Sequence, residues 1–273
     1  MLMKSHSGYL LASAAGLLVI GALTAGAQGI RDQLPPEVHV QRAMGDSVQP
    51  VFDGWQVYPD GTVSMWFGYY NRNTQEEVDV PVGPNNGFDN GMADRGQPTH
   101  FYPRRHQYVF KVDLPKDWKP DAKLTWTLNV RGDPGTAIGW LQPEWQVDEG
   151  VRMMNAGAGL APPEDNKAPS ITGSGDQTVA AGEPLKLTAS ATDDGIPKPR
   201  GPRGGLSIRW ILYRGPGAVT FSETQSTPVQ GKPAESATEA VFEKPGNYWV
   251  QAIASDGLLE TAHNVKVTVT AKR

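Results

Sequence analysis

Two histidines, His100 and His106, are of a type that supports metal or acid–base chemistry. They lie six positions apart, with Asp89 and Asp94 nearby, and imidazole and carboxylate groups are common zinc ligands. Their spacing matches none of the usual zinc motifs. We therefore expect His100 and His106 to contribute to ligand binding rather than to hold zinc.

Three aspartates in turns form a second candidate group. Asp193 and Asp194 precede Gly195, and Asp256 precedes Gly257. Carboxylate oxygens suit the hard Ca²⁺ ion, but Asp–Gly is also an ordinary turn sequence. Both a calcium site and a turn without a ligand stay open at this point.

The sequence gives little support for hydrolytic catalysis. It has no Gly-x-Ser-x-Gly motif and no cysteine, and its five histidines are scattered. The adjacent acids Glu76-Glu77 and Asp148-Glu149 would point to opposite faces of a strand, although a carboxylate pair drawn from distant strands stays open. We predict a protein that is not an enzyme, with a divergent hydrolase as the third alternative.

Six of the eight tryptophans lie between residues 48 and 149. Trp66 and Trp126 fall in expected strands and are predicted core residues. Trp118, Trp140 and Trp145 lie outside clear strands, where exposed rings can stack on sugars or anchor a protein partner. The alternative is that these three rings pack the end of the domain against a linker.

The elements that must position the three aspartates are strands. Strands are expected at 183–191, 206–212, 218–221, 237–242, 247–254 and 264–270. Gly, Pro and Asp turns separate these runs, and apolar residues alternate with polar ones without helical periodicity. Residues 170–273 therefore predict a β-sandwich with Trp210 in its core.

Several segments of this region carry a resemblance to a known family. They are Gly175-Asp176-Gln177-Thr178-Val179, Gly182-Glu183-Pro184-Leu185, Ala191-Thr192-Asp193-Asp194-Gly195, Trp210, Pro245-Gly246-Asn247-Tyr248 and Ala254-Ser255-Asp256-Gly257. Together they resemble the polycystic-kidney-disease (PKD) and cadherin-like Ig-fold repeats of bacteria. The resemblance implies a spacer, adhesion or binding role, and cadherin-like sandwiches place Ca²⁺ between successive domains with such aspartates.

Residues 48–149 predict a second antiparallel sandwich. Strands are expected at 52–58, 62–71, 108–114 and 124–130, with a weaker one near 136–141. Segments of this region, such as Tyr69-Tyr70-Asn71-Arg72-Asn73, resemble uncharacterised bacterial exported proteins, and this resemblance transfers no catalytic residue.

The segment from Pro81 to His106 is long for a connection inside a compact domain. Its aromatic residues can anchor it, and its prolines limit its freedom. It either covers an open sheet edge or binds a ligand through its polar side chains, and the hydrolase alternative would use this loop.

The first 27 residues have the pattern of a cleaved secretory signal peptide. Lys4 and His6 precede an apolar run from Tyr9 to Leu23, and Ala25-Gly26-Ala27 provides the small residues of a cleavage site. An uncleaved membrane anchor is the alternative. An exported chain without cysteine relies on its core alone. A eukaryotic extracellular domain of this kind would often carry a disulfide, so we expect a bacterial periplasmic or secreted protein.

The sequence thus predicts an all-β protein with two antiparallel, Ig-like β-sandwich domains. The expected parts are a signal peptide (1–27), an extended arm (28–47), an N-terminal domain (48–149), a linker (150–169) and an Ig-like domain (170–273). The net charge of −4 argues against nucleic acid as a partner. We expect a binding, adhesion or envelope accessory protein whose partner is a protein or envelope component. Carbohydrate binding is the alternative. We expect no cofactor, with Ca²⁺ as the alternative.

Overall fold

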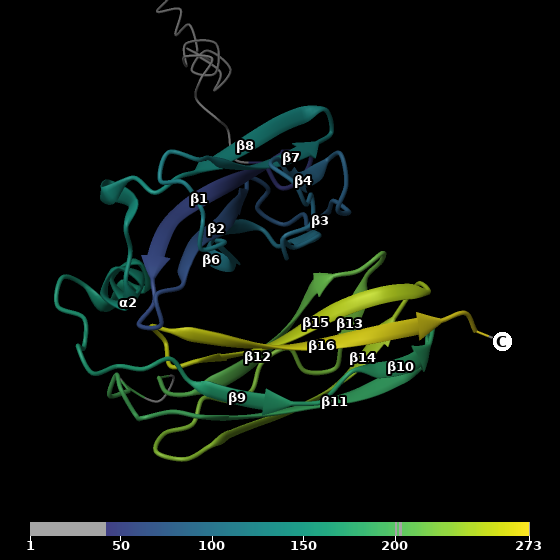
Figure 1. Ribbon diagram of the computed structural model, residues 1–273. Helices are drawn as coiled ribbons and strands as arrows, with labels where there is room; N and C mark the ends of the chain where they lie inside the picture. Colours follow the sequence, from purple (N-terminus) through teal and green to yellow (C-terminus); the bar gives the residue numbers. More distant parts are fainter. Residues whose placement is uncertain (1–41, 200, 202–203, 273) are drawn as a thin grey trace, which may run out of the picture. The chain divides into compact units, whose positions relative to one another are not determined.

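The computed structural model describes residues 42–199, 201 and 204–272, all within one compact unit that spans residues 41–273 (Figure 1). The expected signal peptide and residues 28–41 of the expected arm lie outside the described residues. Strands dominate the regular structure of the described part, as predicted for an all-β protein. No helix in this part is long and apolar enough to cross a membrane.

Two three-stranded antiparallel sheets form the N-terminal sandwich, with strand orders β1-β2-β6 and β4-β7-β8. The strands are β1 (Val48–Val57), β2 (Val63–Asn71), β4 (Asn86–Phe88), β6 (Arg104–Asp113), β7 (Leu124–Val130) and β8 (Asp133–Gly139). Two short strands, β3 (Val78–Asp79) and β5 (His100–Phe101), pair with each other inside the long segment between β2 and β6.

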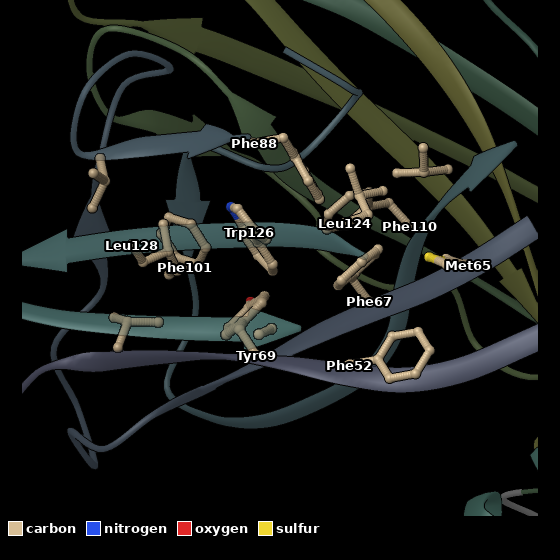
Figure 2. Close-up of a cluster of buried hydrophobic side chains, with 14 of the residues drawn as sticks. Phe52, Met65, Phe67, Tyr69, Phe88, Phe101, Phe110, Leu124, Trp126 and Leu128 are labelled. Carbon is tan, nitrogen blue, oxygen red and sulfur yellow. The ribbon is translucent and has the colours of Figure 1, made fainter. Parts of the chain in front are cut away.

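An aromatic core fills this sandwich (Figure 2). The ring of Phe67 on β2 lies 5.3 Å from Phe88, 5.6 Å from Phe110 and 6.2 Å from Trp126 between centroids. Trp126 is fully buried, which confirms its predicted place in the core. The same prediction for Trp66 is wrong, because alternation along β2 turns Met65 and Phe67 inward and leaves Trp66 half-buried on the other face.

The second sandwich has the strand arrangement of an Ig-like domain. One sheet has the order β13-β14-β11-β9 and the other β10-β16-β15-β12, which correspond to the ABED and CFG sheets of that fold. The strands are β9 (Ser170–Gly173), β10 (Gln177–Ala180), β11 (Pro184–Thr192), β12 (Ser207–Arg214), β13 (Val219–Phe221), β14 (Ala234–Phe242), β15 (Gly246–Ser255) and β16 (Glu260–Thr270).

Two aromatic residues reproduce further features of Ig-like domains. Trp210 on β12 is buried, as predicted, and its indole N–H donates to the Ser236 hydroxyl at 2.9 Å. The Tyr248 hydroxyl donates to the carbonyl of Lys244 at 2.8 Å, across the turn before β15. This is the tyrosine-corner contact of Ig-like sandwiches.

A short helical segment lies where the sequence predicts a linker. It comprises η1 (Pro143–Trp145), α2 (Glu149–Met153) and η2 (Met154–Ala158). Asp148 caps α2 by accepting a hydrogen bond from the amide of Val151 at 2.8 Å, and Met153 is buried. One turn of helix is too short to give a sequence period, which explains why the pattern did not indicate it.

The segment from Pro81 to His106 packs on the outer edge of β12. The amide of Thr99 donates to the carbonyl of Tyr213 at 3.1 Å, and the amide of Leu212 donates to the Tyr102 hydroxyl at 2.9 Å. The other half of this edge is covered by residues 224–229. These contacts agree with the edge-covering interpretation, although the edge belongs to the second sandwich.

Candidate ligand site at the junction of the two sandwiches

A cavity of about 600 Å³ lies between β2, β6 and α2 on one side and β12, β15 and β16 on the other. Its volume falls in the range of small-molecule sites, about 300 to 1,000 Å³. Aromatic, arginine and amide side chains line it. Its lining residues include Trp66, His100, Tyr102, Arg105, His106, Tyr108, Arg152, Asn155, Arg209 and Glu260.

Two β-bulges shape the wall that the first sandwich provides. The strand register shifts between Phe52 and Gly54 on β1 and between Phe67 and Tyr69 on β2. Bulges re-aim side chains and often occur next to functional sites. A side chain on Gly68 would collide with the carbonyl of His106. The close approach of β2 and β6 at this point therefore requires glycine.

A buried ion pair between Asp53 and Arg105 lies directly behind this wall. Asp53 is 4% exposed, contacts the Arg105 guanidinium, and accepts a hydrogen bond from the Tyr108 amide at 2.7 Å. Burial raises the pKa of Asp53, while the charge of Arg105 and the Tyr108 hydrogen bond oppose that shift. The pair holds Arg105 and the backbone of Tyr108 at the cavity.

Arg152 on α2 occupies the aromatic part of the cavity. Its guanidinium carbon lies 4.5 Å from the Trp66 ring centroid and 5.6 Å from that of Tyr108, and the two rings meet edge to face. Among the described residues, no carboxylate forms an ion pair with Arg152, and its buried Nε–H has no partner. A guanidinium stacked in this way is oriented for binding.

The second sandwich contributes a paired arginine to the opposite wall. Arg209 on β12 contacts Glu260 on β16 through both of its terminal nitrogens, at 2.5 Å and 2.9 Å. This bidentate geometry satisfies the fork of Arg209. Its charge is therefore already neutralised inside the cavity.

The predicted ligand-binding histidines both line this cavity, on either side of Tyr102. The ring of His106 stacks on Tyr69 at 4.8 Å between centroids, and burial lowers the pKa of His106. His106 Nε2 lies 3.1 Å from the carbonyl of Pro103. His106 is therefore neutral near pH 7.

His100 has the opposite charge state. Its Nδ1 lies 2.7 Å from Asp79 and its Nε2 lies 3.1 Å from Glu77, and the side chain is 6% exposed. Burial works against the charged ring, but the hydrogen bonds to Asp79 and Glu77 outweigh it and raise the pKa of His100 to about 9. A ring that already carries two protons cannot act as a general base at neutral pH.

The described residues do not form a metal cluster or a nucleophile–base pair. No group of three or more His, Cys, Asp or Glu side chains in that part is arranged to hold a metal ion. None of its hydrogen bonds joins a histidine ring to a hydroxyl side chain, since the rings of His100, His106 and His263 contact carboxylates or backbone carbonyls.

The three predicted sugar-stacking tryptophans lie outside the cavity. Trp118 and Trp140 are half-buried, and Trp145 is 44% exposed. Trp140 and Trp145 lie on Phe52, at 6.5 Å and 5.8 Å between ring centroids, whereas Trp118 packs against the core of the first sandwich. The structure thus brings two of the three predicted residues together around one ring.

The predicted calcium residues are used as turn caps. Asp193 and Asp194 accept hydrogen bonds from the amides of Gly195 and Ile196, and Asp256 accepts from those of Leu258 and Leu259 at 2.6 Å and 2.7 Å.

Two oxygens beside these caps lack a partner among the described residues: Oδ1 of Asp193 and Oδ1 of Asn166, both buried. The amide nitrogen of Asn166 donates to Asp256 at 3.1 Å. Burial, followed by charge repulsion from neighbouring aspartates, raises the pKa of both Asp193 and Asp256. Two carboxylates and an amide oxygen are donors that Ca²⁺ accepts, so calcium stays a prediction.

Sequence reasoning missed the central residues of the cavity. Trp66, Arg152 and Arg209 come from three distant segments, and only the fold brings them to one place. The sequence did contain a signal for Trp66. It lies between two inward-facing residues of one strand, and alternation places such a ring on the outer face.

No family model matches the chain, and no curated protein matches it in sequence. Among solved structures, the chain is similar to the D00–D0 domain of intimin, with 12% identity, a TM-score of 0.26, and coverage of 82% of this chain and 100% of that one. It is also similar to fibronectin(III)-like modules of CbhA from Clostridium thermocellum, with 12% identity, a TM-score of 0.26, and coverage of 82% and 95%. A third similar structure is Drosophila N-cadherin EC1-3, with 10% identity, a TM-score of 0.27, and coverage of 84% of this chain and 90% of that one.

Proposed function

We propose that this chain is an exported, non-enzymatic binding protein of the bacterial envelope, and that it holds its ligand in the cavity at the junction of the two sandwiches. The observation that supports the proposal is the character of that cavity. It has the volume of a ligand site, and aromatic and arginine side chains face it. Its one neutral histidine, His106, contacts a backbone carbonyl rather than a nucleophile.

Thermal melts of the purified protein test this proposal. A ligand that binds only the folded state raises the melting temperature by mass action. We expect at least one member of a panel of soluble envelope polysaccharides and cell-wall peptides to raise it. Ala262→Tyr should abolish the rise, because Ala262 is exposed and lines the cavity.

Thr220→Tyr is the matched control, since Thr220 is exposed on β13 and does not line the cavity. It should leave the rise unchanged. If no panel member acts, or if Ala262→Tyr responds as the natural protein does, the cavity is not the binding site.

Export has its own test. The full chain, expressed in a bacterium with two membranes, should appear in the periplasm or medium with Gln28 at its N-terminus. A product that keeps Met1 and stays in the cytoplasm would contradict export.

Carbohydrate binding by Trp140 and Trp145 is the second candidate. One observation favours it: both rings lie on Phe52, and Trp145 presents 44% of its surface. An exposed tryptophan ring gives a face on which a sugar ring can stack.

A further inference from the structure

The charges around the junction cavity leave one arginine without a counter-charge. Arg105 pairs with Asp53, and Arg209 pairs with Glu260. His100 lies between Glu77 and Asp79. Arg152 is the remaining positively charged residue of the cavity lining, and no described carboxylate pairs with it.

We propose that the cavity binds the carboxylate group of a small organic ligand through Arg152. This inference rests on the proposed binding function and names the chemistry of the ligand. A single unpaired guanidinium matches the single charge of a carboxylate, and its planar fork matches the two carboxylate oxygens.

The surroundings of Arg152 fix its orientation before any ligand arrives. Its guanidinium stacks on Trp66, and the Trp66 indole is held by a hydrogen bond to Gln56 at 3.1 Å. Gln56 in turn donates to Glu149 of α2 at 2.7 Å, so the helix that carries Arg152 is tied to β1, the strand that pairs with the strand of Trp66. Preorganisation of this kind lowers the entropy cost of binding.

The buried Nε–H of Arg152 limits how a ligand can bind. It is shielded from solvent and has no hydrogen-bond partner among the described residues. An atom that water cannot reach is also closed to a carboxylate oxygen of about the same size, so a ligand would bind end-on to the two terminal nitrogens of the Arg152 fork.

The rest of the cavity favours a compact ligand over an extended peptide. Peptides commonly add as a strand to a free sheet edge, but the edge of β12 is covered by residues 99–102 and 224–229. Beside Arg152, the side-chain amide of Asn155 donates to the Tyr108 hydroxyl at 2.9 Å, which places polar groups next to aromatic rings.

The test uses pairs of an acid and its neutral twin: glucuronate with glucose, and N-acetylalanine with its amide. Binding is measured by calorimetry at low salt, near pH 7. We expect at least one acid to bind more tightly than its twin, and Arg152→Gln to weaken that acid about 10- to 100-fold, as for loss of a charged hydrogen bond. The sugar pair and the amino-acid pair show whether the carboxylate that binds belongs to a sugar acid or to an amino-acid derivative.

Two further variants show whether the planar guanidinium of Arg152 or only its positive charge binds the acid, and whether the site matters. Arg152→Lys keeps the charge without the planar fork and should bind the acid more weakly than the natural protein. Arg104→Gln removes a positive charge from an exposed residue that does not line the cavity, and it should change nothing.

The outcomes separate this inference from the proposed function. If an acid and its twin bind alike, and Arg152→Gln keeps that binding, the carboxylate inference is wrong while the cavity remains a binding site. If neither twin binds, although another compound raises the melting temperature in a way that Ala262→Tyr abolishes, only the inference fails. If nothing binds at all, both are wrong.

Discussion

The hydroxyl of Tyr102 accepts a hydrogen bond from the backbone amide of Leu212 at 2.9 Å, although the two residues lie 110 positions apart. This contact joins the long segment of the first sandwich to the open edge of β12 in the second. Further bonds run beside it: the Tyr213 hydroxyl donates to the carbonyl of Gly96, and Arg214 pairs with Asp94. Backbone groups of an exposed edge are thus satisfied inside the chain.

We expect Tyr102→Phe to lower the free energy of unfolding by about 1–3 kcal/mol, because it leaves the Leu212 amide without an acceptor. Urea unfolding monitored by tryptophan fluorescence measures the loss. Tyr58→Phe is the control, since the described structure gives the Tyr58 hydroxyl no hydrogen bond, and its effect should stay within about 0.5 kcal/mol. Equal losses in the two variants would show that the contact is unimportant.

The charge of His100 predicts a loss of stability at high pH. Its pKa is raised to about 9 in the folded chain, against about 6.5 in an unfolded one. Protonation therefore stabilises the fold fully below about pH 6.5, and this contribution disappears as the pH rises through about 9. Melting temperatures between pH 6 and pH 10 measure the effect.

His100→Gln is the matched variant, because glutamine still donates a hydrogen bond but does not titrate in this range. It should be less stable than the natural protein at pH 6 and should lose less between pH 7 and pH 9. Parallel curves for the two proteins would mean that His100 is not charged in the folded state.

Gly68 tests the bulge behind the cavity wall. A Cβ there would overlap the His106 carbonyl and the Asp53 carboxylate, so Gly68→Ala must displace the Asp53–Arg105 pair. We expect a loss of about 2–4 kcal/mol, in the range for disturbance of a buried charge. Gly175→Ala is the control, because a Cβ there meets no atom within 4 Å. Similar melting temperatures for both variants would refute the steric argument.

Local patterns in the sequence were sufficient for the longer strands and for the second sandwich. The alternation over 206–212 placed Trp210 in the core, where it is found, and turn residues marked most strand ends. The short strands β3, β4, β5, β9 and β10 were not predicted, because two to four residues give no period.

The candidate site could be predicted only in part. His100 and His106 were identified by residue type, and they do line the cavity. Arg152 and Trp66 were not, because their stacking depends on a one-turn helix packing against β2, which no local pattern encodes. The unpaired state of Arg152 is likewise a property of the folded arrangement of charges.

Trp145 and Trp126 should respond differently to truncation. Trp126 is fully buried, and Trp126→Ala is expected to cost about 3–5 kcal/mol. Trp145→Ala should cost much less, because that ring is 44% exposed. If the Trp140–Trp145 pair binds carbohydrate, Trp145→Ala should also weaken retention on immobilised polysaccharide while the melting temperature hardly changes. Unchanged retention would contradict the second candidate function.

Calcium is expected to stabilise the turns that contain Asp193 and Asp256. Burial, followed by repulsion from neighbouring aspartates, raises the pKa of both groups, so the folded chain holds their protons more tightly than the unfolded chain does. The free energy of unfolding is unaffected at low pH, where both groups are protonated in either state. It falls as the pH rises from the unfolded to the folded pKa values. A bound cation would offset the repulsion between the ionised carboxylates.

A melt at pH 7 in EDTA and then in millimolar CaCl₂ tests this expectation, with MgCl₂ and ZnCl₂ beside it. The melting temperature should rise most with calcium, by mass action. Asp193→Asn should raise the melting temperature in EDTA, because it removes one repelling charge, and should reduce the calcium response. Asp117→Asn, in an exposed turn, is the control that should leave the response intact. If calcium acts equally on both variants, or not at all, Asp193, Asp194 and Asp256 are turn caps alone.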